Sequence, residues 1–115
     1  MGEFTEVSKT DELKNGTMRA VSAAGREILL ARVGDKYYAT DNRCPHMKGD
    51  LSQGKLEGTV VTCPRHGSQF DISNGRVVRW LKGGPMSKVS RALKPSKDLT
   101  VYNVKVEDDR VLVEV

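Results

Sequence analysis

The chain has 115 residues, of which 37% are hydrophobic and 30% are charged. This composition indicates one globular domain and excludes a disordered chain, and because the longest apolar run is only a few residues, a membrane-spanning segment is excluded as well. The net charge is +4, yet seven basic residues and no acidic residue fall between positions 76 and 97, which leaves 12 basic and 15 acidic residues elsewhere.

Short runs of β-forming residues dominate the first part of the chain. Apolar and β-branched residues gather at 18–21, 28–33 and 36–40. Glycines at Gly25 and Gly34 supply the positive φ that hairpin turns between these runs need. The segment 9–17 is predicted to be a polar connection or a short helical turn.

The second part of the chain predicts further strands. Residues 59–62 and 70–72 are short strands, and Asn74-Gly75 predicts a two-residue hairpin turn into a return strand at 77–80. Apolar residues then alternate with polar ones in three runs, at 99–101, 104–106 and 111–115, with a turn at Asp108-Asp109.

Two stretches rich in glycine and proline, 41–58 and 81–98, are predicted to be loops rather than strands. The fold class is therefore all-β, with many short antiparallel strands in a small sandwich or a partly closed barrel.

All the cysteines and histidines fall in two short arms, Cys44-Pro45-His46 and Cys63-Pro64-Arg65-His66. Each arm supplies one sulfur and one nitrogen donor, and thiolate and imidazole are both metal ligands. Two loops that bring these four donors together can hold a metal centre.

Four other interpretations of these residues stay open at this point. They are buried free thiols beside core histidines, a Cys/His nucleophilic pair, a disulfide between Cys44 and Cys63, and a Cys2His2 zinc site. Zinc sites usually group ligands of one type, whereas each arm here mixes the two. The mixed arms fit a two-iron centre better, with both sulfurs on one iron and both nitrogens on the other.

The spacing Cys-x-His-x16-Cys-x2-His resembles the Rieske [2Fe–2S] signature, and the residues around both arms, at 38–46, 50–54, 63–71 and 73–75, are similar as well. The chain looks like a soluble Rieske-type ferredoxin. This resemblance implies one [2Fe–2S] cluster, with Cys44 and Cys63 on the inner iron and His46 and His66 on the outer iron.

The resemblance also implies how the chain is divided. Residues 1–115 form a single Rieske domain. A small cluster-binding subdomain of about 42–80 is inserted in a base sheet built from 1–41 and 81–115.

Charge explains the use of histidine ligands. Two ferric ions, two sulfides and two thiolates sum to zero with neutral imidazoles, so reduction costs less electrostatic work than in an all-cysteine cluster and the potential is higher.

Several neighbours of the ligands are expected to tune the cluster. By resemblance, Ser68 stands where a serine bonds a bridging sulfide in high-potential relatives, while Phe70 replaces a tyrosine that bonds a cysteine sulfur. We expect Arg43 and Arg65 to raise the potential somewhat, and Pro85 to belong to a proline loop that covers the cluster. The predicted potential is intermediate or low for a Rieske centre.

The resemblance implies a one-electron carrier and not an enzyme, because no further histidine is left to build a mononuclear iron site. A ferredoxin reductase would supply the electron, and a terminal ring-hydroxylating oxygenase is the expected acceptor. Alternatives are a Rieske-like small subunit of the nitrite-reductase type and a zinc-stabilised binding module. We expect a cytoplasmic protein with no membrane anchor, since the N-terminus has no apolar signal segment.

The basic stretch has two interpretations, a solvated loop and a docking patch, with Lys82, Lys88 and Arg91 facing an acidic partner surface. Nucleic acid is a weak third candidate, because Trp80 is the only aromatic residue between positions 76 and 97.

Overall fold

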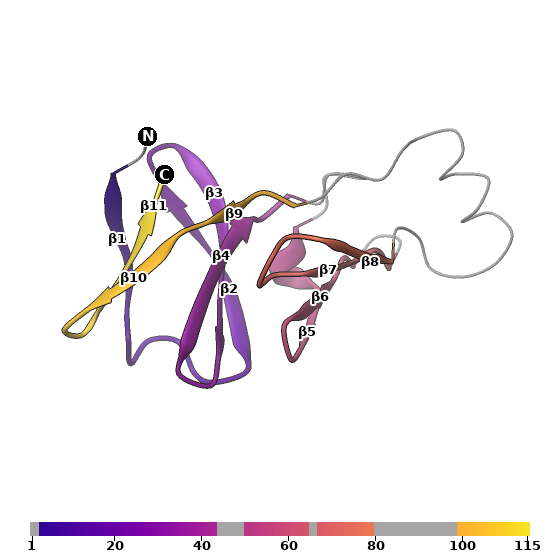
Figure 1. Cartoon of the computed structure of the whole chain (residues 1–115), viewed down its shortest axis with the longest axis horizontal. Coiled ribbons are helices and arrows are strands. Elements are labelled where there is room, and N and C mark those ends of the chain that lie inside the picture. Colours follow the sequence, from indigo (N-terminus) through magenta and orange to yellow (C-terminus); the bar gives the residue numbers. More distant parts are fainter. Residues whose placement is uncertain (1–2, 44–49, 65–66, 80–98) are drawn as a thin grey trace, which may run out of the picture.

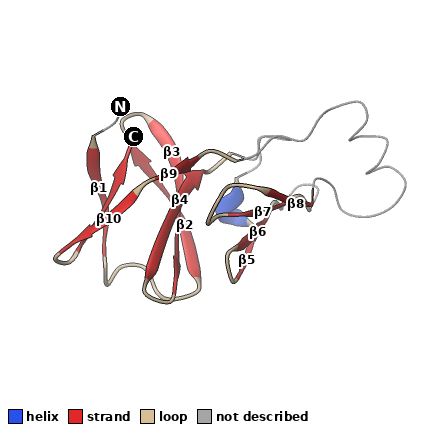
Figure 2. Cartoon of the chain, viewed as in Figure 1, coloured by secondary structure: helices blue, strands red, loops and turns tan. Residues whose placement is uncertain are grey.

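The computed structural model describes residues 3–43, 50–64, 67–79 and 99–115. Within these ranges the chain forms eleven strands and one three-residue 3-10 helix (Figures 1 and 2), which confirms the all-β prediction. The described residues include no helix long and apolar enough to cross a bilayer.

Two antiparallel sheets pack against each other to form the base of the molecule (Figure 1). The first has the order β1-β11-β10, with β1 at Phe4–Lys9, β11 at Arg110–Glu114 and β10 at Val104–Glu107. The second has the order β2-β3-β4-β9, with β2 at Thr17–Ala23, β3 at Arg26–Val33, β4 at Lys36–Asp41 and β9 at Val101–Tyr102.

A third, smaller antiparallel sheet lies beside the second one (Figure 1). Its order is β5-β6-β7-β8, with β5 at Lys55–Glu57, β6 at Val60–Thr62, β7 at Gln69–Asp71 and β8 at Val77–Arg79. The 3-10 helix η1 (Leu51–Gln53) precedes this sheet.

Strand β3 is buried on both faces, and it separates two hydrophobic cores. Ile28 and Leu30 point into the base core, which also holds Leu13, Val21, Ala23, Ala39, Val111 and Val113. Leu29 and Ala31 point the other way into the loop-side core, together with Leu51, Val61, Cys63, Phe70, Ile72 and Leu99. Because side chains alternate along a strand, one continuous apolar run serves both cores.

The turns predicted from glycines are confirmed. Ala24 and Gly25 both have positive φ (51° and 76°) between β2 and β3, and Gly34 (φ 65°) turns β3 into β4. The hairpin at Asn74-Gly75 also exists, but its loop runs from 72 to 76. The two-residue turn was therefore the wrong length, because Asp71 caps the loop by accepting the Ser73 backbone N–H at 2.9 Å.

Two strands were missed. Residues 55–57 were predicted as loop but form β5, a charged edge strand with only Leu56 facing the core. Strand β1 was not predicted because a register shift between Glu6 and Ser8 interrupts its alternation, leaving Phe4 exposed and Val7 inside. The predicted strand at 99–101 starts two residues later, at Val101.

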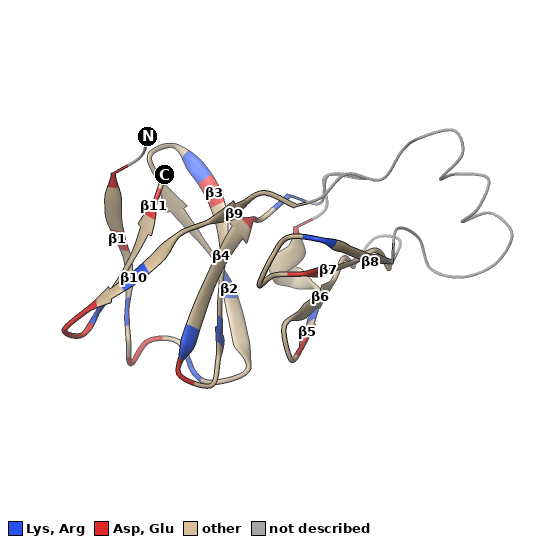
Figure 3. Ribbon diagram, in the orientation of Figure 1, with Lys and Arg blue, Asp and Glu red and all other residues tan. Residues whose placement is uncertain are grey.

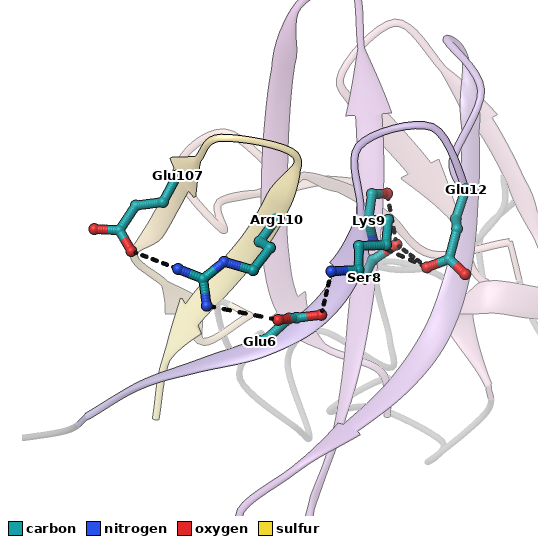
Figure 4. A network of polar contacts seen from close by, with 6 residues as sticks. All are labelled: Glu6, Ser8, Lys9, Glu12, Glu107 and Arg110. Atoms are coloured by element: carbon teal, nitrogen blue, oxygen red, sulfur yellow. Dashed lines mark hydrogen bonds and ion pairs between the residues drawn. The ribbon is translucent and has the colours of Figure 1, made fainter.

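The outer face of the first sheet carries a chain of exposed ion pairs (Figure 4). Arg110 contacts Glu107 at 3.2 Å and Glu6 at 3.8 Å, and Lys9 contacts Glu6 at 3.4 Å. Pairs this exposed contribute about 0–1 kcal/mol each. Their main consequence is a polar, solvent-facing surface over the base core.

A partly buried hydroxyl contact joins β9 to the end of β4. Tyr102 Oη donates to Asp41 Oδ1 at 2.5 Å, and Arg26 Nη1 donates to the same hydroxyl at 3.5 Å. Burial first, and the Asp41 hydrogen bond second, raise the pKa of Tyr102 above its usual value. This contact fixes the chain just before the first arm.

Replacing Tyr102 by phenylalanine tests this contact. The folded protein holds the phenol proton more tightly than the unfolded chain does, so this group's contribution to the unfolding free energy is present below pH ~10 and declines above it. The Tyr102→Phe variant should lose about 1 kcal/mol at pH 7 and show a shallower decline above pH 10 in urea titrations. Tyr38→Phe is the control, and an unchanged alkaline slope in Tyr102→Phe would contradict the assignment.

Candidate metal centre

Cys63 lies at the end of β6, where a short loop leads into β7. Its backbone N–H donates to Ser68 O at 2.7 Å, and the Gly67 N–H donates to Cys63 O at 3.2 Å. These bonds close the stem of the second loop, between β6 and β7.

The Cys63 residue is only 2% exposed and packs in the loop-side core with Val61 and Phe70. A thiol at this place, buried beside the second loop, can supply one sulfur ligand to a metal centre.

The residues on either side of the first loop, which spans 44–49, pair with each other. Arg43 and Asp50 form an isolated antiparallel bridge on either side of residues 44–49. Buried Asn42 accepts the Leu51 N–H on its backbone oxygen at 2.8 Å and the Ser52 N–H on Oδ1 at 3.0 Å. This pairing forms the stem of the first loop.

The two loop stems lie directly against each other. Gly54, which ends η1, packs on the backbone of Thr62 so closely that a β-carbon at this position would collide with the Thr62 carbonyl oxygen and touch Pro64. The chain leaving the first loop therefore runs across the chain entering the second. This contact holds the described residues that follow the first loop against those that begin the second.

The predicted site residues divide into two groups. Cys63, Ser68 and Phe70 lie in the described ranges and come together around the second loop. The other ligands, tuning residues and docking residues lie outside the described residues; these are Cys44, His46, His66, Arg65, Pro85, Lys82, Lys88 and Arg91. Their roles stay predictions.

Ser68 and Phe70 are both fully buried beside Cys63. The Ser68 carbonyl accepts the Cys63 N–H, and Phe70 pairs with Val61 across β6 and with Val77 across β8. Phe70 is thus a core residue whose ring supports the sheet that carries the second loop. Its effect on a cluster potential remains a prediction.

Sequence reasoning missed the residues that hold the loops together. Asn42 and Gly54 lie on either side of the first arm. A polar residue and a glycine so close to predicted ligands could have indicated a loop held by hydrogen bonds and close backbone contact. Glu27, which pairs with Arg43, lies on β3, and no short-range pattern connects it to the arm.

The described residues offer no competing metal site. None of their histidine, cysteine, aspartate and glutamate side chains form a group of three or more that could hold an ion. The buried Cys63 sulfur, next to the contact between the two stems, is the donor that the described residues can offer to a cluster.

Comparison with known proteins agrees with this geometry. Residues 3–102 match the family model of the Rieske [2Fe–2S] domain. A ferredoxin component of naphthalene 1,2-dioxygenase/salicylate 5-hydroxylase systems from Ralstonia sp is 32% identical, over 91% of this chain and 88% of that protein.

Solved structures agree as well. The ferredoxin of carbazole 1,9a-dioxygenase from Nocardioides aromaticivorans IC177 superposes with a TM-score of 0.79 at 28% identity, covering 96% of this chain and 95% of its own. A chain in a complex of reduced oxygenase and oxidized ferredoxin in carbazole 1,9a-dioxygenase also gives a TM-score of 0.79, at 30% identity, with coverage of 96% and 92%.

A Gly54→Ala substitution should separate the two stems. Displacing the Thr62 backbone should cost about 1–3 kcal/mol and lower the amount of cluster retained per folded protein, measured as the ratio of visible to ultraviolet absorbance. The control is Gly34→Ala, which is strained by its positive φ but sits at the opposite end of β4 with no nearby atoms. Equal cluster retention in the two variants would contradict a role for this contact.

Proposed function

This chain belongs to the Rieske [2Fe–2S] domain family, and we propose that it carries single electrons from a ferredoxin reductase to a terminal ring-hydroxylating oxygenase. It binds one [2Fe–2S] cluster, which supplies a site for one electron, and it is an electron-transfer component rather than a catalytic subunit. An oxygenase acceptor is supported by relatives that are ferredoxin components of dioxygenase systems and by a solved ferredoxin–oxygenase complex. We place this activity in the cytoplasm.

The observation that supports the proposal is the buried thiol of Cys63 beside the contact between the two loop stems. We assign Cys44 and Cys63 to the inner iron and His46 and His66 to the outer iron. The Cys63 side chain lies among the apolar residues of the loop-side core. The histidines then belong on the side of the cluster away from this core, where a partner can approach.

The same arrangement supports the proposed division of the chain. The sheet β5–β8 and both loops fall within about 42–80, which we take as the cluster-binding subdomain. Residues 1–41 and 81–115 form the base. We keep Ser68, Phe70, Arg65 and Pro85 as the residues that tune or cover the cluster.

Partner docking is assigned to the basic stretch, with Lys82, Lys88 and Arg91 meeting an acidic surface on the partner. Over the described part of the base, positive and negative side chains are interspersed (Figure 3). A surface of mixed sign steers an approaching protein weakly, whereas a single-sign stretch adjoining β8 concentrates the field.

Low-temperature EPR of the dithionite-reduced protein tests the ligand assignment. We expect the low average g-value of a cluster with histidine ligands. Cys63→Ser and His66→Ala should each lose this signal, while Lys55→Gln on the exposed edge strand β5 should retain it. A wild-type signal in either ligand variant, or a colourless protein, would refute the assignment.

Charge reversal tests the docking stretch. Lys82→Glu combined with Lys88→Glu should slow electron transfer to the oxygenase by about tenfold at low ionic strength and flatten its salt dependence. Lys14→Glu with Lys36→Glu, on the base, changes the net charge equally and should have little effect. Equal slowing in both pairs would contradict local steering, and stopped-flow absorbance measures the rates.

A further inference from the structure

Three charged side chains tie the stem of the first loop to the base. Arg43 Nε lies 2.8 Å from a carboxylate oxygen of Glu27, and Arg43 Nη1 lies 2.9 Å from Asp50 Oδ1. Glu27 belongs to β3, whereas Arg43 and Asp50 are the two sides of the loop stem. One guanidinium group therefore joins the base strand to both ends of residues 44–49.

The shape of arginine suits a contact with two carboxylates. A planar guanidinium offers donors in fixed directions and can hold two carboxylates at once, whereas an ammonium group is a single point charge. The three side chains are about half exposed, at 56%, 44% and 42% for Arg43, Glu27 and Asp50. Asp50 Oδ1 itself is shielded from water and accepts no hydrogen bond from the described residues, so its 2.9 Å contact with Arg43 Nη1 is an ion pair, which is screened less than an ordinary surface pair.

The backbone next to these side chains is also hydrogen-bonded across β3 and β4. The Asn42 N–H donates to Glu27 O at 3.2 Å, so the strand pairing of β3 and β4 continues to the residue before Arg43. The side-chain contacts extend this pairing past the end of the strand and onto the loop.

We propose that Arg43 is a positioning residue: through Glu27 and Asp50 it clamps the stem of the first loop onto β3 and thereby fixes the placement of the donors of Cys44 and His46. This inference rests on the proposed ligand roles of those two residues. It also revises the expected effect of Arg43 on the potential, because two carboxylates more than offset its positive charge.

A purely electrostatic role makes different predictions. Removing the Glu27 charge would then raise the reduction potential, removing the Arg43 charge would lower it, and the two effects would add. A clamp predicts instead that both changes loosen the same loop. Both variants should lose the cluster faster and broaden the EPR signal, and the double variant should be no worse than Arg43→Gln alone.

The test uses the cluster-loaded protein and three variants, Glu27→Gln, Arg43→Gln and the double substitution. We expect cluster loss under a chelator to accelerate about fivefold in each, with altered EPR g-values and non-additive effects. Arg43→Lys keeps the charge but loses the planar set of donors that spans both carboxylates, so its cluster loss should lie nearer to that of Arg43→Gln than to wild type. The matched control is Glu57→Gln, an exposed glutamate on β5, which should behave as wild type.

Two results would overturn the clamp: a Glu27→Gln variant identical to Glu57→Gln in g-values and cluster loss, or opposite and additive shifts of potential in the single variants. A wild-type protein without a Rieske EPR signal would instead refute the ligand assignment. In that case, unequal hydrogen exchange at Leu51 and Ser52 between Glu27→Gln and Glu57→Gln would still support a clamped stem, and equal exchange would refute it.

Discussion

The placement of every functional element depends on the burial of both faces of strand β3. Ile28 and Leu30 fill the base core, while Leu29 and Ala31 form the floor on which the small sheet and its loops rest. A strand buried on both sides cannot shift its register by one residue without exchanging the two sets of side chains. The position of β3 therefore determines where the small sheet β5–β8 packs against the base.

Above this floor, polar contacts replace apolar ones as the means of holding the loops. Asn42, on one side of the first stem, accepts from Leu51 and Ser52 on the other side, Cys63 and Ser68 close the second stem, and Gly54 lets the two stems touch. A loop fixed at its base by hydrogen bonds keeps its ligands near one geometry in both charge states of a bound centre. Small rearrangement between charge states is what a one-electron carrier requires of its ligand loops.

The strands and the ligand motif could be predicted from sequence because both are local patterns. Alternation at 104–106 and 111–115 and glycines at turns identify the hairpins, and four cysteines and histidines in two arms identify a metal centre and the family. The missed features depend on distant partners. Strand β1 is visible only through its pairing with β11, and Glu27 belongs to the loop stem only because β3 and β4 pair in the register that the fold imposes.

The position of Cys63 connects folding to the bound centre. Its side chain belongs to the same core as Leu29 and Phe70, so the contacts that hold the thiol in place are also contacts that attach the small sheet to the base. A group that binds only the folded arrangement of both arms stabilises that arrangement by mass action. The stabilisation falls on β5–β8 and the loop-side core, because Cys63, the predicted ligand that lies in the described part of the chain, belongs to that core and not to the base core. Loss of the centre should therefore loosen the small sheet first and leave the two base sheets paired.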